Sequence, residues 1–241
     1  MHRFRIVPIG EGNTILLSDA AQLHHLRDVA RLGVGDEVVV FDDSGNESLC
    51  VVEKISNKDA VLTVKTRGQL SISATTLTIA CAIPKKGMDD VIDKLTQLGV
   101  KDIIPVITER VVVRFAGENA QRKVSRWRRL ALSAAEQSQR NTIPYIWPVT
   151  DLNEVISHFQ DYDLKLIPNL SGNPKSIVEV MAGLRPKNIL VMIGPEGDFT
   201  AEEVELAKNV GFVPVSLGRL VLRVDTAAAA VAAYIRISLG I

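Results

Sequence analysis

The residues best suited to chemistry form a short turn between an apolar run and a helix start. The run 189–193 is typical of a buried strand, Gly194-Pro195-Glu196-Gly197 ends it, and Thr200 with Glu203 has the spacing of a capping box. A strand, a glycine turn and a helix in that order place backbone N–H groups at the strand's carboxyl end, where open α/β sheets bind ligands. The turn matches neither a phosphate loop nor a Gly-x-Gly-x-x-Gly turn. We therefore expect a small-molecule site of a less common kind.

Two further loops follow predicted strands in the same way. Pro168-Asn169-Leu170-Ser171-Gly172 follows a strand that ends near Ile167, and the loop from Leu217-Gly218 to Arg223 follows the last strand. Any one such loop is more often an ordinary glycine turn. Three of them after successive strands favour a pocket whose backbone donors and acceptors read a planar heterocycle.

A second candidate site lies on a long helix predicted over residues 119–138. Its apolar stripe, which indicates core packing or a subunit contact, comprises Trp127, Leu130, Ala131 and Ala134. Glu136 and Arg140 are four residues apart on a polar face with Arg129 and Ser133, so we expect the two to lie one turn apart and to pair. The pair is either a surface salt bridge worth under about 1 kcal/mol or a rigid carboxylate and guanidinium that face a substrate.

The charge of the chain is balanced overall but uneven along it. Formal net charge is zero, yet residues 110–140 hold eight cations and two acids, a local excess of six positive charges. The cations are Arg110, Arg114, Arg122, Lys123, Arg126, Arg128, Arg129 and Arg140, and the acids are Glu118 and Glu136. Such a segment is either a nucleic-acid-binding face or a solvated helix surface.

Other classes of function find no support. Cys50 and Cys81 provide neither a disulfide framework nor metal-ligand spacing, which favours a reducing cytoplasm. None of the four histidines has a partner at the spacing of a catalytic triad or a metal site. The N-terminus lacks the apolar core of a signal peptide, and the apolar run 226–235 is far shorter than the roughly 20 residues that span a bilayer. We expect no metal and no membrane role.

Two patterns of elements divide the chain. Short β-rich runs at 4–9, 14–17, 37–41, 49–55 and 60–66 surround one amphipathic segment at 20–32, which predicts a small barrel-like domain. The likeliest linker is 67–74. From Thr75 onward, strands at 77–82, 103–107, 164–168, 189–193 and 213–217 alternate with helices at 88–98, 119–138, 152–159, 175–182, 201–210 and 226–237. This alternation predicts an α/β fold with a parallel sheet and helices on both faces.

Several motifs together resemble the RsmE-type methyltransferases of the SPOUT (trefoil-knotted) class. They include the turn 194–199, the segments 217–218 and 222–227, Glu136-Gln137-Ser138-Gln139-Arg140, Lys94 to Val100, Thr108-Glu109-Arg110, and Arg31 to Asp36. The resemblance runs essentially end to end, with the motifs in the expected order. It implies a PUA-like RNA-binding β-barrel at residues 1–70 and a trefoil-knotted, parallel-sheet SPOUT methyltransferase domain at 75–241.

The resemblance also implies a reaction and its partners. The family is homodimeric and cytoplasmic, uses S-adenosylmethionine, and methylates N3 of one uridine in 16S ribosomal RNA, for which the assembled small subunit is the expected substrate. Carried over by position, the cofactor residues are Leu166, Ile167, Pro168, Asn169, Ile193, Gly194, Pro195, Glu196, Gly197, Leu217, Gly218, Leu222, Arg223 and Thr226. The expected RNA contacts are Arg3, Arg5, Arg31, Arg110, Arg122, Arg126 and Arg129.

Four positions depart from the family's usual pattern. Asp225 replaces a usual Glu but is still expected to cap the last helix, Gln97 replaces a Glu, and Val111 replaces a Ser. Asp198 stands where a Gly is common and is expected to affect the geometry of the turn.

In the expected mechanism, uridine N3 loses its proton and leaves negative charge on O2 and O4. Arg140 stabilises that charge and cannot be the base, because a guanidinium stays protonated. Glu136 either accepts the proton or orients Arg140, and the sequence leaves both roles open.

Three alternatives remain at this stage. A SPOUT methyltransferase for another rRNA or tRNA nucleotide is the nearest. A non-catalytic RNA-binding ribosome factor would have no affinity for S-adenosylmethionine. An α/β enzyme acting on a free nucleotide or metabolite would need neither RNA nor residues 1–70.

Overall fold

A computed structural model describes the chain except for residues 43–44, 70–74, 112–116, 159–160 and 170. The chain forms two compact units. The first comprises Met1–Ile72 together with Ala135–Ile143, and the second comprises Ser73–Ala134 and Pro144–Ile241. A short segment from the middle of the chain therefore belongs to the N-terminal unit.

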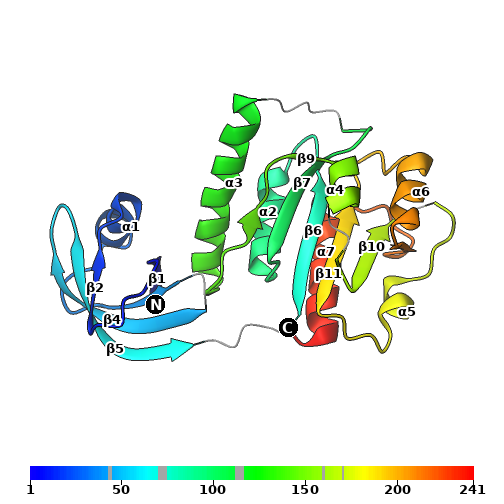
Figure 1. Ribbon diagram of the computed structural model, residues 1–241. Coiled ribbons are helices and arrows are strands. Elements are labelled where there is room, and N and C mark those ends of the chain that lie inside the picture. The colour runs from blue at the N-terminus through cyan, green and yellow to red at the C-terminus, as the bar shows by residue number, and fades with distance from the viewer. Residues whose placement is uncertain (43–44, 70–74, 112–116, 159–160, 170) are drawn as a thin grey trace. The chain divides into compact units, whose positions relative to one another are not determined.

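The first unit is built on a five-stranded sheet in the order β1-β3-β4-β5-β2 (Figure 1). Its strands are β1 (His2–Arg5), β2 (Thr14–Leu17), β3 (Glu37–Phe41), β4 (Asn46–Ile55) and β5 (Ala60–Gln69). β1 pairs with β3 in parallel, and the other pairs are antiparallel. Register shifts between β4 and β5 interrupt their ladder, and such irregularities bend and twist long strands. One face of the sheet packs on Leu23 and Leu26 of the helical segment.

That helical segment changes type part-way along. Helix α1 (Ala20–His24) begins at Asp19, whose carboxylate accepts from the backbone N–H groups of Ala21 and Gln22. It continues as the π-helical turn η1 (His25–Val29). The predicted linker 67–74 is displaced, because β5 extends to Gln69, and residues 70–74 lie outside the described part of the chain.

The second unit is built on a parallel sheet. The strand order is β12-β10-β11-β6-β7-β8, and β9 also pairs with β7. The strands are β6 (Thr76–Ala82), β7 (Asp102–Ile107), β8 (Tyr145–Ile146), β9 (Thr150–Asp151), β10 (Leu164–Pro168), β11 (Asn188–Ile193) and β12 (Phe212–Val215). β11 is buried from Ile189 to Ile193, as expected for a strand covered on both faces.

Six helices of the second unit are described, and they cover this sheet. They are α2 (Met88–Gln97), α3 (Glu118–Gln137), α4 (Leu152–His158), α5 (Ile177–Met181), α6 (Ala201–Asn209) and α7 (Val224–Leu239). Residues of α4 and α6 pack with Ala80, Leu190 and Met192 on one face. α7 contacts α2, β6 and β11 on the other (Figure 1). The sheet edge at the carboxyl ends of β10 and β11 is where loops meet.

The predicted fold class is confirmed: the structure is α/β, with a parallel sheet and a curled N-terminal sheet. Most predicted elements agree with the structure to within one or two residues. The two-residue strands β8 and β9 were not predicted, since they are too short to show a periodic pattern. Among the described residues, none of the helices is long and apolar enough to cross a membrane.

Candidate functional site

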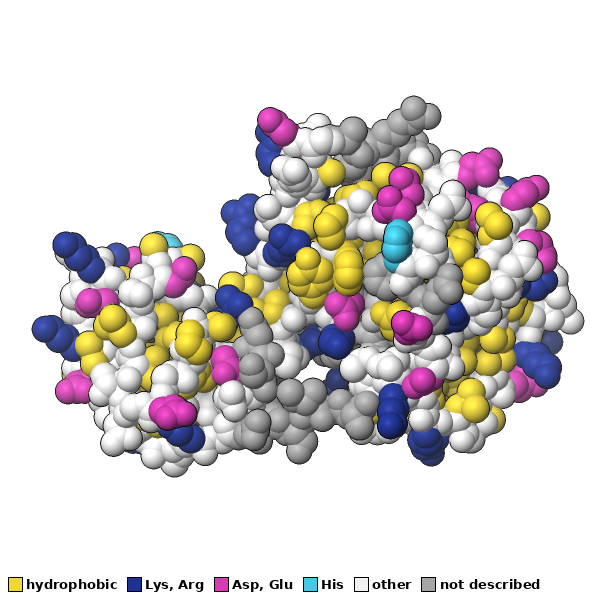
Figure 2. Space-filling view, viewed as in Figure 1, with side chains coloured by type: hydrophobic (Ala, Val, Ile, Leu, Met, Phe, Trp, Pro, Cys, Tyr) yellow, Lys and Arg dark blue, Asp and Glu magenta, His cyan; other side chains and the backbone are white. Residues whose placement is uncertain are grey.

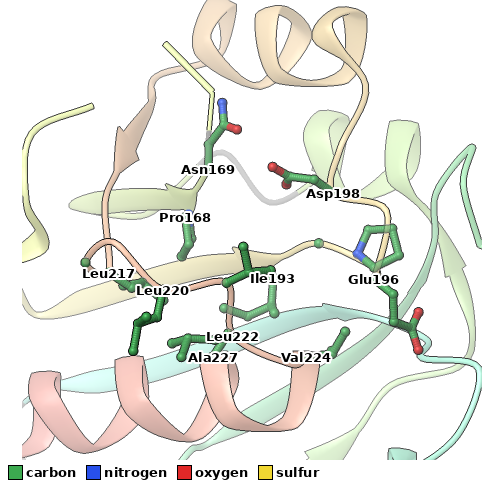
Figure 3. A pocket seen from close by; sticks show the side chains of 14 residues that line it. Pro168, Asn169, Ile193, Glu196, Asp198, Leu217, Leu220, Leu222, Val224 and Ala227 are labelled. Carbon is green, nitrogen blue, oxygen red and sulfur yellow. The ribbon is translucent and has the colours of Figure 1, made fainter. Parts of the chain in front are cut away.

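A pocket lies at the carboxyl ends of β10 and β11, in the second unit (Figure 3). The loops after β10, β11 and β12 and the first turns of α7 enclose it, with about 590 Å³ of empty space that includes open solvent. Asn169 and Asp198 place polar groups on one side, and Leu220, Leu222 and Ala227 form an apolar wall on the other.

Most of the residues expected around a ligand line this pocket. They are Pro168, Asn169, Ile193, Gly194, Pro195, Glu196, Leu217, Gly218 and Leu222. The three loops that the sequence analysis singled out therefore converge.

Five expected residues lie elsewhere. Leu166 and Ile167 are fully buried in β10, so their side chains belong to the core. Gly197 stands between the lining residues Glu196 and Asp198 without lining the pocket itself, and a Cβ there would lie 3.4 Å from the Arg110 side chain. Arg223 is the N-cap residue of α7, and Thr226 is exposed on its first turn.

Five further lining residues lie within the loops and motifs that the sequence analysis singled out, but it did not name them as cofactor contacts: Asp198, Leu220, Val221, Val224 and Ala227. Leu220 and Val221 are 76% and 77% exposed, which is unusual for large apolar side chains at the rim of a pocket. Their position straight after Gly218-Arg219, outside any strand or helix, was the signal that could have identified them.

The turn after β11 is shaped by bonds between near neighbours. The predicted capping box is present: Thr200 Oγ1 accepts from Glu203 N at 3.2 Å, and Glu203 Oε2 accepts from Thr200 N at 2.8 Å. Asp198 takes a left-handed φ of 60°, and its carboxylate accepts from Phe199 N at 2.8 Å. Aspartate tolerates this conformation better than most residues, so it can stand where a glycine is common.

Gly194 is required by close packing and not by its backbone angles. A Cβ at this position would lie 3.1 Å from the Phe199 ring and 3.2 Å from Asp198 Oδ1. Few real Cβ atoms come so close to a neighbour, so a side chain here requires Phe199 or Asp198 to shift by a few tenths of an ångström.

Contacts from elsewhere in the second unit fix this turn. Arg110 Nη1 donates to the Gly197 carbonyl at 2.6 Å, and the backbone N–H of Lys85 donates to Glu196 Oε1 at 2.9 Å. Arg110, which was expected to contact RNA, is thus bonded to the turn after β11. Its guanidinium replaces water at a carbonyl that would otherwise need another donor.

An ion pair joins α2 to α7 beside the pocket. Lys94 Nζ lies 2.7 Å from Asp225 Oδ2, and this hydrogen bond holds the pKa of Asp225 below its usual range. Asp225 was expected to cap the last helix, but the N-cap residue is Arg223. Asp225 instead lies in the first turn, where a negative charge is favoured by the helix dipole.

The prediction that Glu136 and Arg140 lie one turn apart on a helix is wrong. α3 ends at Gln137, Gln139 takes a left-handed φ of 59°, and Arg140 N donates to the Ala135 carbonyl at 2.9 Å. A second bond, from Gln139 N to the Glu136 carbonyl at 3.3 Å, completes the pattern of a Schellman motif. Arg140 therefore leaves the helix direction, and its Nε donates to Thr142 Oγ1 at 3.0 Å.

The carboxylate of Glu136 faces the helical segment of the first unit. It accepts from Gln22 Nε2 at 2.9 Å, and His25 Nδ1 lies 3.8 Å from it. Its side chain is 11% exposed, and this burial raises the pKa of Glu136.

The expected RNA contacts fall into different environments. The side chain of Arg3 is 9% exposed and is paired with Glu47. Arg126 pairs with Asp89. Arg31, Arg122 and Arg129 are exposed, and Arg5 is half-buried. Arg114 lies outside the described residues.

A groove along α3 collects several of these cations. Arg122, Lys123, Arg126 and Arg129 line it, and Figure 2 shows Lys and Arg side chains gathered over this helix. The opposite face of α3 is buried through Val124, Trp127, Ala131 and Ala134, as its apolar stripe predicted.

Comparison with known proteins identifies the family. Residues 71–236 match the RNA methyltransferase domain, and residues 17–65 match the RNA methyltransferase PUA domain. The chain belongs to this RNA methyltransferase family. It is 33% identical to ribosomal RNA small subunit methyltransferase E of Synechocystis sp. over 86% of this chain and 68% of that protein. The Bacillus subtilis protein of the same name is 28% identical over 86% of this chain and 83% of its own length.

Solved structures of similar proteins include two with S-adenosylmethionine. A methyltransferase from Legionella pneumophila has a TM-score of 0.89 and 28% identity, covering 98% of this chain and 97% of that one. Ribosomal RNA small subunit methyltransferase E from Neisseria gonorrhoeae has a TM-score of 0.87 and 29% identity, covering 99% and 98%. Both proteins were solved with the methyl donor bound.

Proposed function

We propose that this RNA methyltransferase transfers a methyl group from S-adenosylmethionine to N3 of a uridine in 16S ribosomal RNA. The observation that carries the proposal is the pocket formed by three loops at one sheet edge, in a chain similar over nearly its full length to proteins solved with this donor. The residues that line the pocket fit S-adenosylmethionine. Ile193, Leu220 and Leu222 would offer apolar surface to an adenine, and Glu196 would supply a negative charge to a cationic ligand.

The expected cofactor residues have two kinds of role in this proposal. The lining residues contact S-adenosylmethionine, whereas Leu166, Ile167, Gly197, Arg223 and Thr226 support the loops that do. When bound, S-adenosylmethionine supplies an electrophilic methyl group. The chain contributes the alignment of donor and acceptor, which accounts for much of the rate of an in-line displacement.

We assign the acceptor side to Arg140. Its guanidinium stabilises the negative charge that develops on the uridine oxygens when N3 loses its proton, and it stays protonated throughout. Glu136 is bonded to Gln22 and largely buried. We therefore assign Glu136 to holding the end of α3, in preference to the role of base.

RNA binding is divided between the two parts of the chain. The exposed cations Arg122, Lys123 and Arg129 of the α3 groove and Arg31 of the N-terminal unit hold phosphates, which positions the RNA without reading its bases. Residues 1–70 act as the RNA-binding domain, and residues 75–241 carry the transfer. A paired uridine would have to be exposed first.

The remaining parts of the proposal concern assembly and place. The protein acts as a homodimer in the cytoplasm, on the assembled small subunit. α7 offers an exposed surface for a second copy at Thr226, Ala230 and Ile237, of which Ile237 is 80% exposed. Light scattering on the purified protein measures this oligomeric state.

The decisive experiment is methyl transfer from labelled S-adenosylmethionine to unmodified small ribosomal subunits, naked 16S RNA and tRNA in parallel. Nucleoside analysis should recover 3-methyluridine from the subunits alone or with the greatest yield. Label in tRNA or in another nucleoside would redirect the proposal to another SPOUT substrate. Cofactor binding without label in any RNA would reject an RNA substrate and favour a free metabolite, and no cofactor binding would favour a ribosome factor without catalysis.

A further inference from the structure

Arg3 is a buried cation that the proposed mechanism does not use. Its Nη2 donates to Glu47 Oε2 at 3.0 Å and to Asn141 Oδ1, and its guanidinium carbon lies 5.5 Å from the centroid of the Phe41 ring. A buried guanidinium is costly to the fold unless it is paired and fully bonded. Arg3 therefore depends on partners that hold it in one place.

Asn141 completes a triangle of side chains with Arg3 and Glu47. Its Nδ2 donates to Glu47 Oε2 at 3.0 Å, so one carboxylate oxygen accepts from both of the other residues. The hydrogen bond from Asn141 is the largest cause that holds the pKa of Glu47 below its usual range. Asn141 is 4% exposed. The residue next to Arg140 is thus fixed to strands β1 and β4.

A second anchor lies on the other side of Arg140. Gln22 Nε2 donates to the Glu136 carboxylate at 2.9 Å, and Gln22 Oε1 accepts from the backbone N–H of Arg5 at 3.2 Å. Gln22 is 7% exposed. Residues 136 and 141 are therefore both bonded to the N-terminal sheet and its helix, and Arg140 lies between them.

We propose that Arg3, Glu47 and Gln22 are positioning residues, through which the N-terminal unit sets the orientation of Arg140 for methyl transfer. The inference rests on the proposed function, and in particular on the role of Arg140. A guanidinium that stabilises developing charge acts only in the correct geometry, and a displacement of about 1 Å can cost about 100-fold in rate. The N-terminal unit then contributes to the chemical step as well as to RNA binding.

The test uses two variants of the full-length enzyme in the N-terminal unit, Gln22→Met in α1 and Glu47→Gln in β4. We expect each to lower kcat for methyl transfer about 10-fold, while KM for the RNA and Kd for S-adenosylmethionine stay within about twofold. The matched control is Glu37→Gln, which breaks an exposed ion pair with Lys65 (2.7 Å) on the same sheet and should leave kcat unchanged. A rise in KM with unchanged kcat would overturn the proposal, because it would indicate RNA binding alone.

A double-mutant cycle separates positioning from general damage. Arg140→Lys should keep a measurable residual rate, and adding Gln22→Met to it should cause little further loss, since the residue being positioned is already impaired. Losses that multiply would overturn the proposal. Gln22→Met leaves the part-buried Arg3–Glu47 pair intact, so it carries the test if Glu47→Gln fails to fold.

The same measurements distinguish this proposal from the one on which it rests. Full turnover by Arg140→Lys and Arg140→Ala would remove the proposed role of Arg140. If the Arg140 variants are impaired but the losses from Arg140→Lys and Gln22→Met multiply, only the positioning role of Gln22, Arg3 and Glu47 would be removed. Absence of methyl transfer by the unaltered enzyme would remove the proposed function itself.

Discussion

The turn 194–200 takes its shape from bonds between near neighbours, whereas the segment 135–143 takes its place from partners far away in the sequence. Within the turn, Thr200 bonds to Glu203 and Asp198 to Phe199, over separations of three residues and one. In the segment, Asn141 bonds to Arg3 over 138 residues and Glu136 to Gln22 over 114. Arg110 and Lys85 also hold the turn from elsewhere in the second unit, but its capping box and the Asp198 bond are local. The segment 135–143 is bonded to strands β1 and β4 and to helix α1.

This difference bears on how each region tolerates change. A locally bonded turn is sensitive to the volume of its own residues, because its atoms are already in contact. A segment held by distant partners is sensitive to substitutions in those partners, and it transmits the state of the N-terminal unit to Arg140. Variants in the two regions should therefore affect different steps: cofactor binding in the first, and turnover in the second.

The largest effect on cofactor binding is expected from Gly194→Val. Its Cβ would lie within 3.2 Å of Phe199 and Asp198, and the branched methyl groups would need further space. Overpacking of 1–3 kcal/mol, as an order of magnitude, corresponds to roughly a 5- to 150-fold weaker Kd for S-adenosylmethionine. Titration calorimetry measures the loss. Gly12→Val is the control, since a Cβ there has nothing within 4 Å. Normal affinity in Gly194→Val would mean that the turn is not the cofactor site.

The largest effect on turnover is expected from Arg140→Ala. Removal of a donor to a developing oxyanion typically lowers kcat about 100- to 1,000-fold, so turnover should fall by that order. Kd for S-adenosylmethionine should stay within about twofold, because Arg140 does not line the pocket. Single-turnover kinetics with small subunits measures the rate. Arg185→Ala, which removes an exposed arginine in the second unit, is the control. Equal rates for Arg140→Ala and the unaltered enzyme would mean that Arg140 takes no part in methyl transfer. The pocket and the segment 135–143 would then not serve the same reaction.

The same contrast explains which parts of the molecule the sequence predicts. Strands such as β10 and β11 are apolar runs, and the capping box at Thr200 is a pattern over four residues, so both follow from local sequence. The helix end at Gln137 does not. Glycine is the usual residue beyond such an end, and here Gln139 takes the left-handed conformation. Without that signal the helical pattern runs on to Arg140, and the predicted pair with Glu136 fails.

Long-range contacts account for the other failures. An arginine is usually exposed at the surface, but the Arg3 side chain is largely covered and bonds to Glu47 and Asn141. Arg110 likewise bonds to Gly197, 87 residues away. No pattern within either neighbourhood indicates these partners, because they are brought together by the strand order of each sheet.

A moderate effect is expected from Leu220→Ala. Leu220 lines the pocket and is 76% exposed, so a bound cofactor can cover apolar surface that now faces solvent. Losing part of that burial should cost about 1 kcal/mol and weaken Kd for S-adenosylmethionine about fivefold, with kcat little altered. Leu206→Ala is the control: Leu206 is 47% exposed on α6 and does not line this pocket. A change in turnover greater than the change in affinity would contradict a purely binding role for this wall.

The smallest effect concerns the two left-handed residues, one in each region. Gln139→Gly should raise the free energy of unfolding by about 0.5 kcal/mol, because relief of the left-handed conformation outweighs the greater freedom that glycine gives the unfolded chain. Asp198→Gly should gain less, since it also loses the carboxylate that accepts from Phe199 N at 2.8 Å. Chemical denaturation of both variants measures the difference, and Gln121→Gly inside α3 should destabilise by about 1 kcal/mol as the control. Equal gains would show that the Asp198 bond contributes nothing to the turn, and the local bonding that distinguishes the two regions would then rest on the capping box alone.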